Sequence, residues 1–297
     1  MKKAFLFFLL AAVAAGLCPR VATAQTTVTP GWLAWLGDGS EGAYSCTSRR
    51  CVLGGEHWFS SFTVASGATV LNTTVNSPVI IRSTGACTVH GTISNSVKTP
   101  SRSLKPAGGG VNFNGDFGGA GGGGGGGAVG VLVEGQNGLG TVGMGGLPID
   151  NGGPGGGAGA TGGVGQSVDS GQYHMILSSG SFWPVGGAAG GQGGCNGQGK
   201  CGGDGGAGGG PVILICSSLN FTGTIDVSGE RGAPAPTDST GGGGGGGGGY
   251  VIFSALNYVA NTGTINVNGG AGGSCKTTGC AVGGAGGSGF DYFQTIQ

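Results

Sequence analysis

The sequence predicts an all-β fold in which parallel, solenoid-like repeats of about 40 residues are braced by glycine rods of the polyglycine II type. No significant helix is expected outside an N-terminal signal peptide. Three observations favour this fold over a disordered, low-complexity chain. Apolar runs follow glycine-rich segments at a nearly constant spacing, and a second landmark keeps the same phase. The chain also has only 12 basic and 12 acidic residues in 297, whereas disordered chains usually carry many charges.

Residues 1–24 have the form of a signal peptide. Lys2 and Lys3 precede an apolar stretch that is too short to span a membrane, and Ala22-Thr-Ala24 matches a cleavage site. We therefore expect a mature chain that begins at Gln25 and is secreted or exposed on the cell surface. No later segment is expected to cross a membrane, and the lack of a basic excess argues against nucleic acid as a partner.

Residues 25–107 are predicted to form a β-rich N-terminal part of the solenoid, or its cap. Glycine is ordinary there, and residues 60–95 form short β-branched runs separated by Ser, Thr, Asn and Gly. The stretch His90-Gly-Thr-Ile-Ser94 resembles the second landmark of the later repeats. Residues 98–106 are polar, hold two prolines and are predicted to be a linker.

Residues 108–297 are predicted to form a glycine-rich repeat domain. Its apolar runs recur at a nearly even spacing and begin at Gly130, Tyr173, Pro211, Tyr250 and Phe290. The second landmark, Thr-Gly-Thr-Ile, begins at Thr222 and recurs at Thr262, in phase with the apolar runs. The first strand of a repeat is continuously apolar, which is typical of a strand covered on both faces. The second strand alternates, which is typical of a half-exposed strand.

Glycine blocks separate these strands, and 69 of the 79 glycines follow residue 107. Collagen is excluded because the glycines come in blocks and there are only 11 prolines. Ordering a glycine backbone costs roughly 1–2 kcal/mol, so an ordered block needs an offsetting interaction. Extended three-fold rods without side chains can supply it, because they approach closely enough to hydrogen-bond each other's backbones. In residues 190–210 the larger side chains fall mainly on every third position, as such a rod requires.

Eight cysteines follow the signal peptide, and an exported chain is expected to oxidise them. Three close pairs are disulfide candidates, each closing a small loop: Cys46 with Cys51, Cys195 with Cys201, and Cys275 with Cys280. The two other cysteines, Cys87 and Cys216, either bond to each other or stay buried and reduced. Zinc is the alternative for the close pairs, but their spacings differ from those of zinc motifs. No metal or cofactor is expected.

Several stretches resemble secreted glycine-rich repeat proteins of bacteria: residues 36–46, 62–70 and 79–94, followed by glycine blocks, Val-Ile-Leu-Ile and Thr-Gly-Thr-Ile-Asp-Val-Ser-Gly. The glycine blocks also resemble the polyglycine II sandwich of phage tail-fibre adhesins and, more distantly, the glycine-rich snow-flea antifreeze protein. The phage resemblance implies receptor binding by loops at the ends of rods, and the antifreeze resemblance implies a flat ice-binding face. The signal peptide departs from the first, and the strands and aromatic residues depart from the second.

The candidate binding site lies in residues 167–185, which interrupt the glycine-rich region with Tyr173, His174, Phe182 and Trp183. A protruding loop with aromatic side chains suits a sugar or a surface receptor. Alternatively, Tyr173 begins a repeat strand and Trp183 covers a glycine rod. A second aromatic group, which we expect to cap the open end of the repeats rather than to bind a ligand, consists of Trp32, Trp35 and Trp58.

No catalytic residues are predicted. The three histidines form no metal-spaced pair, the carboxylates are thinly spread, and no Gly-x-Ser-x-Gly motif occurs. Residues 270–277 resemble a phosphate loop, but Cys275 replaces a required glycine. The sequence therefore predicts a secreted structural or adhesive protein without enzymatic activity, with a surface glycan or a cell-surface receptor as its partner. The alternatives are a parallel β-helix enzyme acting on polysaccharides, disfavoured by the sparse charge, and an ice-binding protein that uses the Thr-Gly-Thr-Ile threonines.

Overall fold

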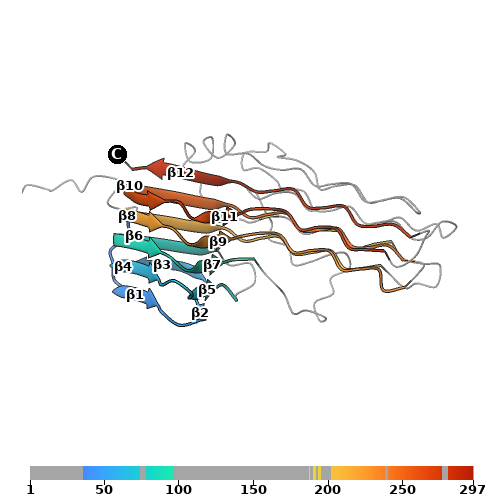
Figure 1. Ribbon diagram of the computed structural model, residues 1–297, viewed down its shortest axis with the longest axis horizontal. Coiled ribbons are helices and arrows are strands. Elements are labelled where there is room, and N and C mark those ends of the chain that lie inside the picture. The colour runs from blue at the N-terminus through green and yellow to red at the C-terminus, as the bar shows by residue number, and fades with distance from the viewer. Residues whose placement is uncertain are drawn as a thin grey trace, which may run out of the picture. The chain divides into compact units, whose positions relative to one another are not determined.

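The computed structural model describes residues 36–73, 78–96, 187, 190–191, 193–194, 202–237, 240–275 and 280–296, all within one compact unit, Gly31–Gln297. These residues form two parallel β-sheets, and no helix occurs among them (Figure 1). None of them lies in a helix that could cross a membrane. Predictions that fall outside the described residues concern the signal peptide, Trp32, Trp35, the linker 98–106, the runs at Gly130 and Tyr173, and the pair Cys195/Cys201.

Sheet A has seven strands and sheet B has five. Sheet A has the order β1-β4-β6-β8-β10-β12, with β3 also paired to β6. Its strands are β1 (Ala43–Cys46), β3 (Gly55–Phe59), β4 (Ser61–Val64), β6 (Val79–Val89), β8 (Val212–Phe221), β10 (Val251–Asn261) and β12 (Asp291–Thr295). Sheet B has the order β11-β9-β7-β5-β2. Its strands are β2 (Cys51–Val52), β5 (Thr69–Leu71), β7 (Thr92–Ser94), β9 (Thr224–Asp226) and β11 (Thr264–Asn266).

Each strand of sheet B follows a strand of sheet A after a short turn, and successive strand pairs stack in register. Val212 pairs with Val251, and Val251 pairs in turn with Asp291. Thr224 pairs with Thr264, so the partners in sheet B are offset along the chain by the same repeat as those in sheet A. The spacing of the apolar runs along the sequence therefore matches the strand register of sheet A. The spacing of the Thr-Gly-Thr-Ile landmark matches the strand register of sheet B.

Glycine at the turn between the two strands of a pair is a steric requirement. A Cβ added to Gly223 would lie less than 3.0 Å from the carbonyl oxygen of Gly91 in the preceding turn. A Cβ on Gly263 would likewise approach the ring of Phe221 and the carbonyl of Gly223. The turns stack too closely for a side chain, which explains why glycine recurs in the landmark.

In sheet A, a strand of the N-terminal region lies next to a strand of the glycine-rich region. Strand β6 pairs with β8 from Val79↔Val212 to Val89↔Phe221, although a long stretch of sequence separates the two strands. In the described part of the chain, no strand from the intervening residues lies between β6 and β8. The disulfide Cys87–Cys216, with a sequence separation of 129, links these two strands in the core.

Two further disulfides, Cys46–Cys51 and Cys275–Cys280, each close a short loop. In the loop-entropy estimate a loop this small contributes about 2 kcal/mol, whereas the long loop closed by Cys87–Cys216 contributes about 5 kcal/mol. Three disulfides are consistent with an extracellular protein.

The main core lies between the two sheets. Its fully buried side chains include Phe62, Ile81, Leu214 and Phe253 from sheet A, and Ile225 from sheet B. A second apolar cluster covers the other face of sheet A and contains Leu36, Ile80, Ile213, Ile215, Tyr250, Ile252, Phe290 and Ile296. Because both faces of sheet A are covered here, the first half of β8 is continuously apolar and buried. The strands of sheet B alternate, as in Thr224, Ile225 and Asp226, where only the isoleucine is fully buried.

The glycine-rich segment 240–249 lies within a network of backbone hydrogen bonds. Its successive N–H groups point in three directions in turn, and N–H groups three residues apart donate to the same neighbouring segment. Gly242, Gly245 and Gly248 donate to Ala281, Gly284 and Gly287; Gly243, Gly246 and Gly249 donate to Ala233, Glu230 and Val227; Gly241 and Gly244 donate to Gly194 and Gly191. Its carbonyls accept from two further segments, in bonds such as Gly206 to Gly244 and Gly270 to Gly246. Described residues of five other segments thus bond to this one laterally.

The close approach of these segments leaves no room for side chains. A Cβ at Gly245 would lie less than 3.0 Å from the carbonyl oxygen of Gly270, and one at Gly246 equally close to that of Ala207. Residues 240–250 are all buried. The lateral hydrogen bonds offset the entropy that ordered glycine loses, and they form only because the Cβ is missing.

We predict that Gly245→Ala destabilises the fold by roughly 1–3 kcal/mol, because the methyl group overpacks against the Gly270 carbonyl. The free energy of unfolding in urea measures this. The control is Val282→Ala, in the next glycine-rich segment, where the side chain is 42% exposed and its truncation should change stability little. Equal stability of both variants and the parent would show that segment 240–249 is not packed as described.

Candidate functional site

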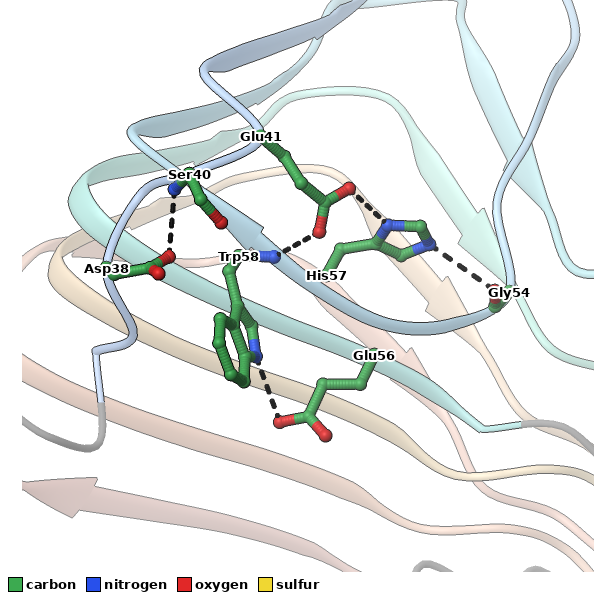
Figure 2. Close-up of polar contacts among 7 residues, drawn as sticks. All are labelled: Asp38, Ser40, Glu41, Gly54, Glu56, His57 and Trp58. Atoms are coloured by element: carbon green, nitrogen blue, oxygen red, sulfur yellow. Dashed lines mark hydrogen bonds and ion pairs between the residues drawn. The ribbon is translucent and has the colours of Figure 1, made fainter.

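The four binding residues predicted from the sequence, Tyr173, His174, Phe182 and Trp183, lie outside the described residues, so that site remains a prediction. Among the described residues, polar and aromatic side chains gather instead around β3. We call this group the β3 cluster; its members are Asp38, Glu41, Glu56, His57, Trp58 and Arg82 (Figure 2, which draws all but Arg82).

A glycine-rich loop brings two acidic residues to β3. Gly37, Gly39 and Gly42 have positive φ angles of 78°, 69° and 72°, a conformation that residues with a side chain rarely adopt. The turns they allow place Asp38 and Glu41 beside the strand. The loop is joined to β3 by backbone bonds from the Glu41 amide to the Trp58 carbonyl and from the Ser60 amide to the Gly42 carbonyl.

Glu41 binds two residues of β3 through its two carboxylate oxygens. Oε2 lies 2.8 Å from Nδ1 of His57, and Oε1 accepts the backbone N–H of Trp58 at 2.7 Å. The hydrogen bond from His57, followed by that from Trp58, lowers the pKa of Glu41 below its ordinary value. The other ring nitrogen of His57 lies 3.3 Å from the Gly54 carbonyl oxygen, so a protonated imidazole can donate to both acceptors.

Glu56 orients the indole of Trp58. One of its oxygens, Oε1, accepts a hydrogen bond from Nε of Arg82 at 2.5 Å and another from Nε1 of Trp58 at 3.3 Å. Burial alone would raise the pKa of Glu56, but the hydrogen bonds from Arg82 and Trp58 outweigh it and lower the pKa. Trp58 and Arg82 are direct partners in the register of β3 and β6. Backbone and side chain of Trp58 are therefore both held in place.

Despite these contacts Trp58 is 42% exposed, more than any other large aromatic residue of the described part. Asp38 is also exposed, and hydrogen bonds from Ser40 lower its pKa. The cluster thus combines an accessible aromatic ring with three carboxylates that are ionised at neutral pH and two basic side chains. This chemistry suits the binding of a ligand that has an apolar face and hydrogen-bond donors.

Sequence analysis assigned Trp58 to a capping group and did not single out Glu41, Glu56 or Arg82. One local signal was available, because Glu56 and Trp58 are two residues apart and so share a face of a strand. The contribution of Glu41 could not be read from the sequence, since it depends on how the loop turns at three positive-φ glycines.

Sheet B carries a second regular feature, a row of threonines on the side away from the core. Thr69, Thr92, Thr224 and Thr264 are consecutive partners in the sheet register, and all are at least partly exposed. Neighbouring strands of a sheet are about 4.8 Å apart, so the hydroxyl groups repeat at that interval. In the described ranges no three His, Cys, Asp or Glu side chains group together in a way that could hold a metal ion.

We predict that His57→Phe raises the pKa of Glu41 toward its ordinary value of 4.5. Phenylalanine can keep the ring stacking of His57 on Phe59 while it removes the hydrogen bond. Because the folded-state pKa of Glu41 is lowered, its contacts stabilise the fold above the ordinary pKa, and this contribution is lost as the pH falls through the folded-state pKa.

NMR titration of the carboxyl carbons measures both glutamates of the cluster. The pKa of Glu56 serves as the internal control, because its partners Arg82 and Trp58 are not changed. An unchanged pKa of Glu41 in His57→Phe would contradict the contact.

Comparison with protein-family models, curated proteins and solved structures found no match to this chain.

Proposed function

We propose that this chain is an exported, disulfide-linked structural or adhesive protein that presents a rigid binding surface outside the cell and catalyses no reaction. The observation that carries the proposal is the pattern of backbone hydrogen bonds in segment 240–249. Amides three residues apart donate to the same neighbouring segment, and consecutive amides donate to different segments. Such a network holds the backbone in one fixed arrangement. This suits a protein that resists load or presents a ligand-binding surface better than a protein whose function needs moving parts.

The glycine segments are best understood as polyglycine II rods that brace a solenoid-like stack of strand pairs. A polyglycine II helix has three residues per turn, so its amides point in three directions and can bond to separate neighbours. Two observations support this interpretation. Backbone N–H donors three residues apart bond to the same segment, and there is no space for a Cβ at Gly245 or Gly246. The in-register pairing of β6, β8, β10 and β12 supports the solenoid-like stacking.

The electrostatics of the β3 cluster suit hydrogen bonding to a ligand and do not suit general-acid catalysis. A carboxyl group that acts as a general acid at neutral pH needs a raised pKa. The pKa values of Asp38, Glu41 and Glu56 are all lowered, by hydrogen bonds that they accept. These carboxylates are therefore suited to accept hydrogen bonds from a ligand, and a surface glycan or a cell-surface receptor is the partner we infer.

We expect the full chain, recovered from the envelope or medium of an expressing bacterium, to bind saturably to intact bacterial cells or to their isolated surface polysaccharides. Bound protein is quantified by sedimentation with the cells over a range of concentrations. Trp183→Ala tests in the same assay whether the predicted loop contributes. Absence of saturable binding to every surface tested, or the release of sugar fragments from the polysaccharides, would contradict the proposal.

A second candidate function is ice binding, favoured by the threonine row of sheet B. Four threonines in register present hydroxyl and methyl groups at a fixed interval on one side of a sheet. If this row binds ice, the full chain inhibits ice recrystallisation, and Thr224→Lys abolishes the effect by placing a long charged side chain within the row. A parent chain without inhibition or thermal hysteresis would remove this candidate.

A further inference from the structure

We propose that the β3 cluster is a binding site for a neutral glycan, with Trp58 as the platform on which a sugar ring stacks. The inference rests on the proposed adhesive function, for which it names a site and a class of ligand. It does not involve Trp183 or the other binding residues predicted from the sequence.

Trp58 is the most exposed large aromatic residue of the described part of the chain, followed by Phe293 at 36%. Phe62, Phe221, Phe253 and Tyr250 are fully buried, and Phe59, the next residue, is 4% exposed. Trp58 remains 42% exposed although its indole N–H and its backbone are both hydrogen-bonded. An exposed ring held at several points loses little freedom on binding, so its contact with a ligand is not offset by ordering.

Two carboxylates lie near this ring. Figure 2 shows the indole between the side chains of Asp38 and Glu56. Glu56 uses Oε1 for Arg82 and Trp58, and its Oε2 has no hydrogen-bond partner among the described residues. Asp38 engages Ser40 through Oδ1 and is exposed. Each carboxylate can therefore accept a charge-assisted hydrogen bond from a hydroxyl group beside the ring.

These features match a pyranose ring, which has an apolar face of C–H groups and a rim of hydroxyl donors. The C–H face can lie on the indole, and rim hydroxyls can donate to Asp38 and Glu56. The ring of Trp58 is backed by the loop, since a Cβ on Gly37 would lie only 3.3 Å from its Cγ. The loop glycine thus lets the backbone pack closely against the platform.

The charge balance of the cluster selects a neutral glycan over an acidic one. Three carboxylates face two basic side chains, and both basic groups are already engaged, Arg82 with Glu56 and His57 with Glu41. An acidic sugar would bring another negative charge to Asp38 and Glu56 without a free cation to receive it. A cationic sugar would be attracted, but nothing in the cluster provides the closed aromatic cage that a cation favours.

The test measures binding of the full chain to dextran and galactomannan as neutral glycans, alginate as an acidic one and chitosan oligosaccharide as a cationic one. We expect affinity electrophoresis and calorimetry to show binding to at least one neutral glycan. Trp58→Ala should weaken it about tenfold, from the loss of stacking. Glu56→Gln should weaken it severalfold, because the amide retains the shape and loses the charge. The control Val259→Ala removes an apolar side chain that is 63% exposed on β10, and should bind like the parent.

Far-ultraviolet circular dichroism and a count of free thiols establish that each variant has kept its fold. Folded Trp58→Ala that binds neutral glycan as the parent does would overturn the site. Preferential binding of alginate or of chitosan, or of no soluble glycan at all, would overturn the ligand class. Cell binding that persists undiminished in Trp58→Ala would refute this inference and leave the adhesive function standing. Trp58-dependent binding of soluble glycan without any binding to cells would support the site and refute the adhesive function.

Discussion

Lateral hydrogen bonding between glycine segments is the interaction on which the other features of this structure depend. It requires backbones to approach within contact of one another's carbonyl groups, and a single Cβ at Gly245 or Gly246 would prevent that. The same segments lead directly into β8, β10 and β12. The packing of these glycine segments therefore positions the starts of β8, β10 and β12 in sheet A, and the parallel register of these three strands continues that of the glycine segments.

The strand region stabilises the same arrangement by different means. Its core between sheets A and B is apolar, and the second face of sheet A is covered as well, so β8 and β10 begin with side chains that are buried on both sides. Cys87–Cys216 links β6 to β8 across the same long stretch of sequence that separates the paired strands β7 and β9 of sheet B. Strands β8, β10 and β12 do not need such a link, since each is joined to the next by a shorter path along the chain.

The parts of this fold that follow from local periodicity could be predicted from the sequence. The apolar run at Val212, the alternation around Ile225 and the parallel arrangement all have the expected form. The bond between Cys87 and Cys216 remained open because the pairing of β6 with β8 is a long-range choice that no local pattern encodes. The β3 cluster was missed for a similar reason: Glu41 and His57 are well separated in the sequence, and they meet because the glycine-rich loop that holds Glu41 lies beside β3.

The division between glycine and strand regions also determines where binding chemistry can occur. The buried glycines of segment 240–249 have no side chains, and their amides and carbonyls are bonded to neighbouring segments, so this segment offers a ligand little to recognise. The strands and the loops beside them carry the side chains of the β3 cluster. Strand β3 is suited to this role because it pairs only with β6 among the described strands, and its other side is lined by the loop that holds Asp38 and Glu41. On this strand Trp58 is 42% exposed, although its backbone and indole are both hydrogen-bonded.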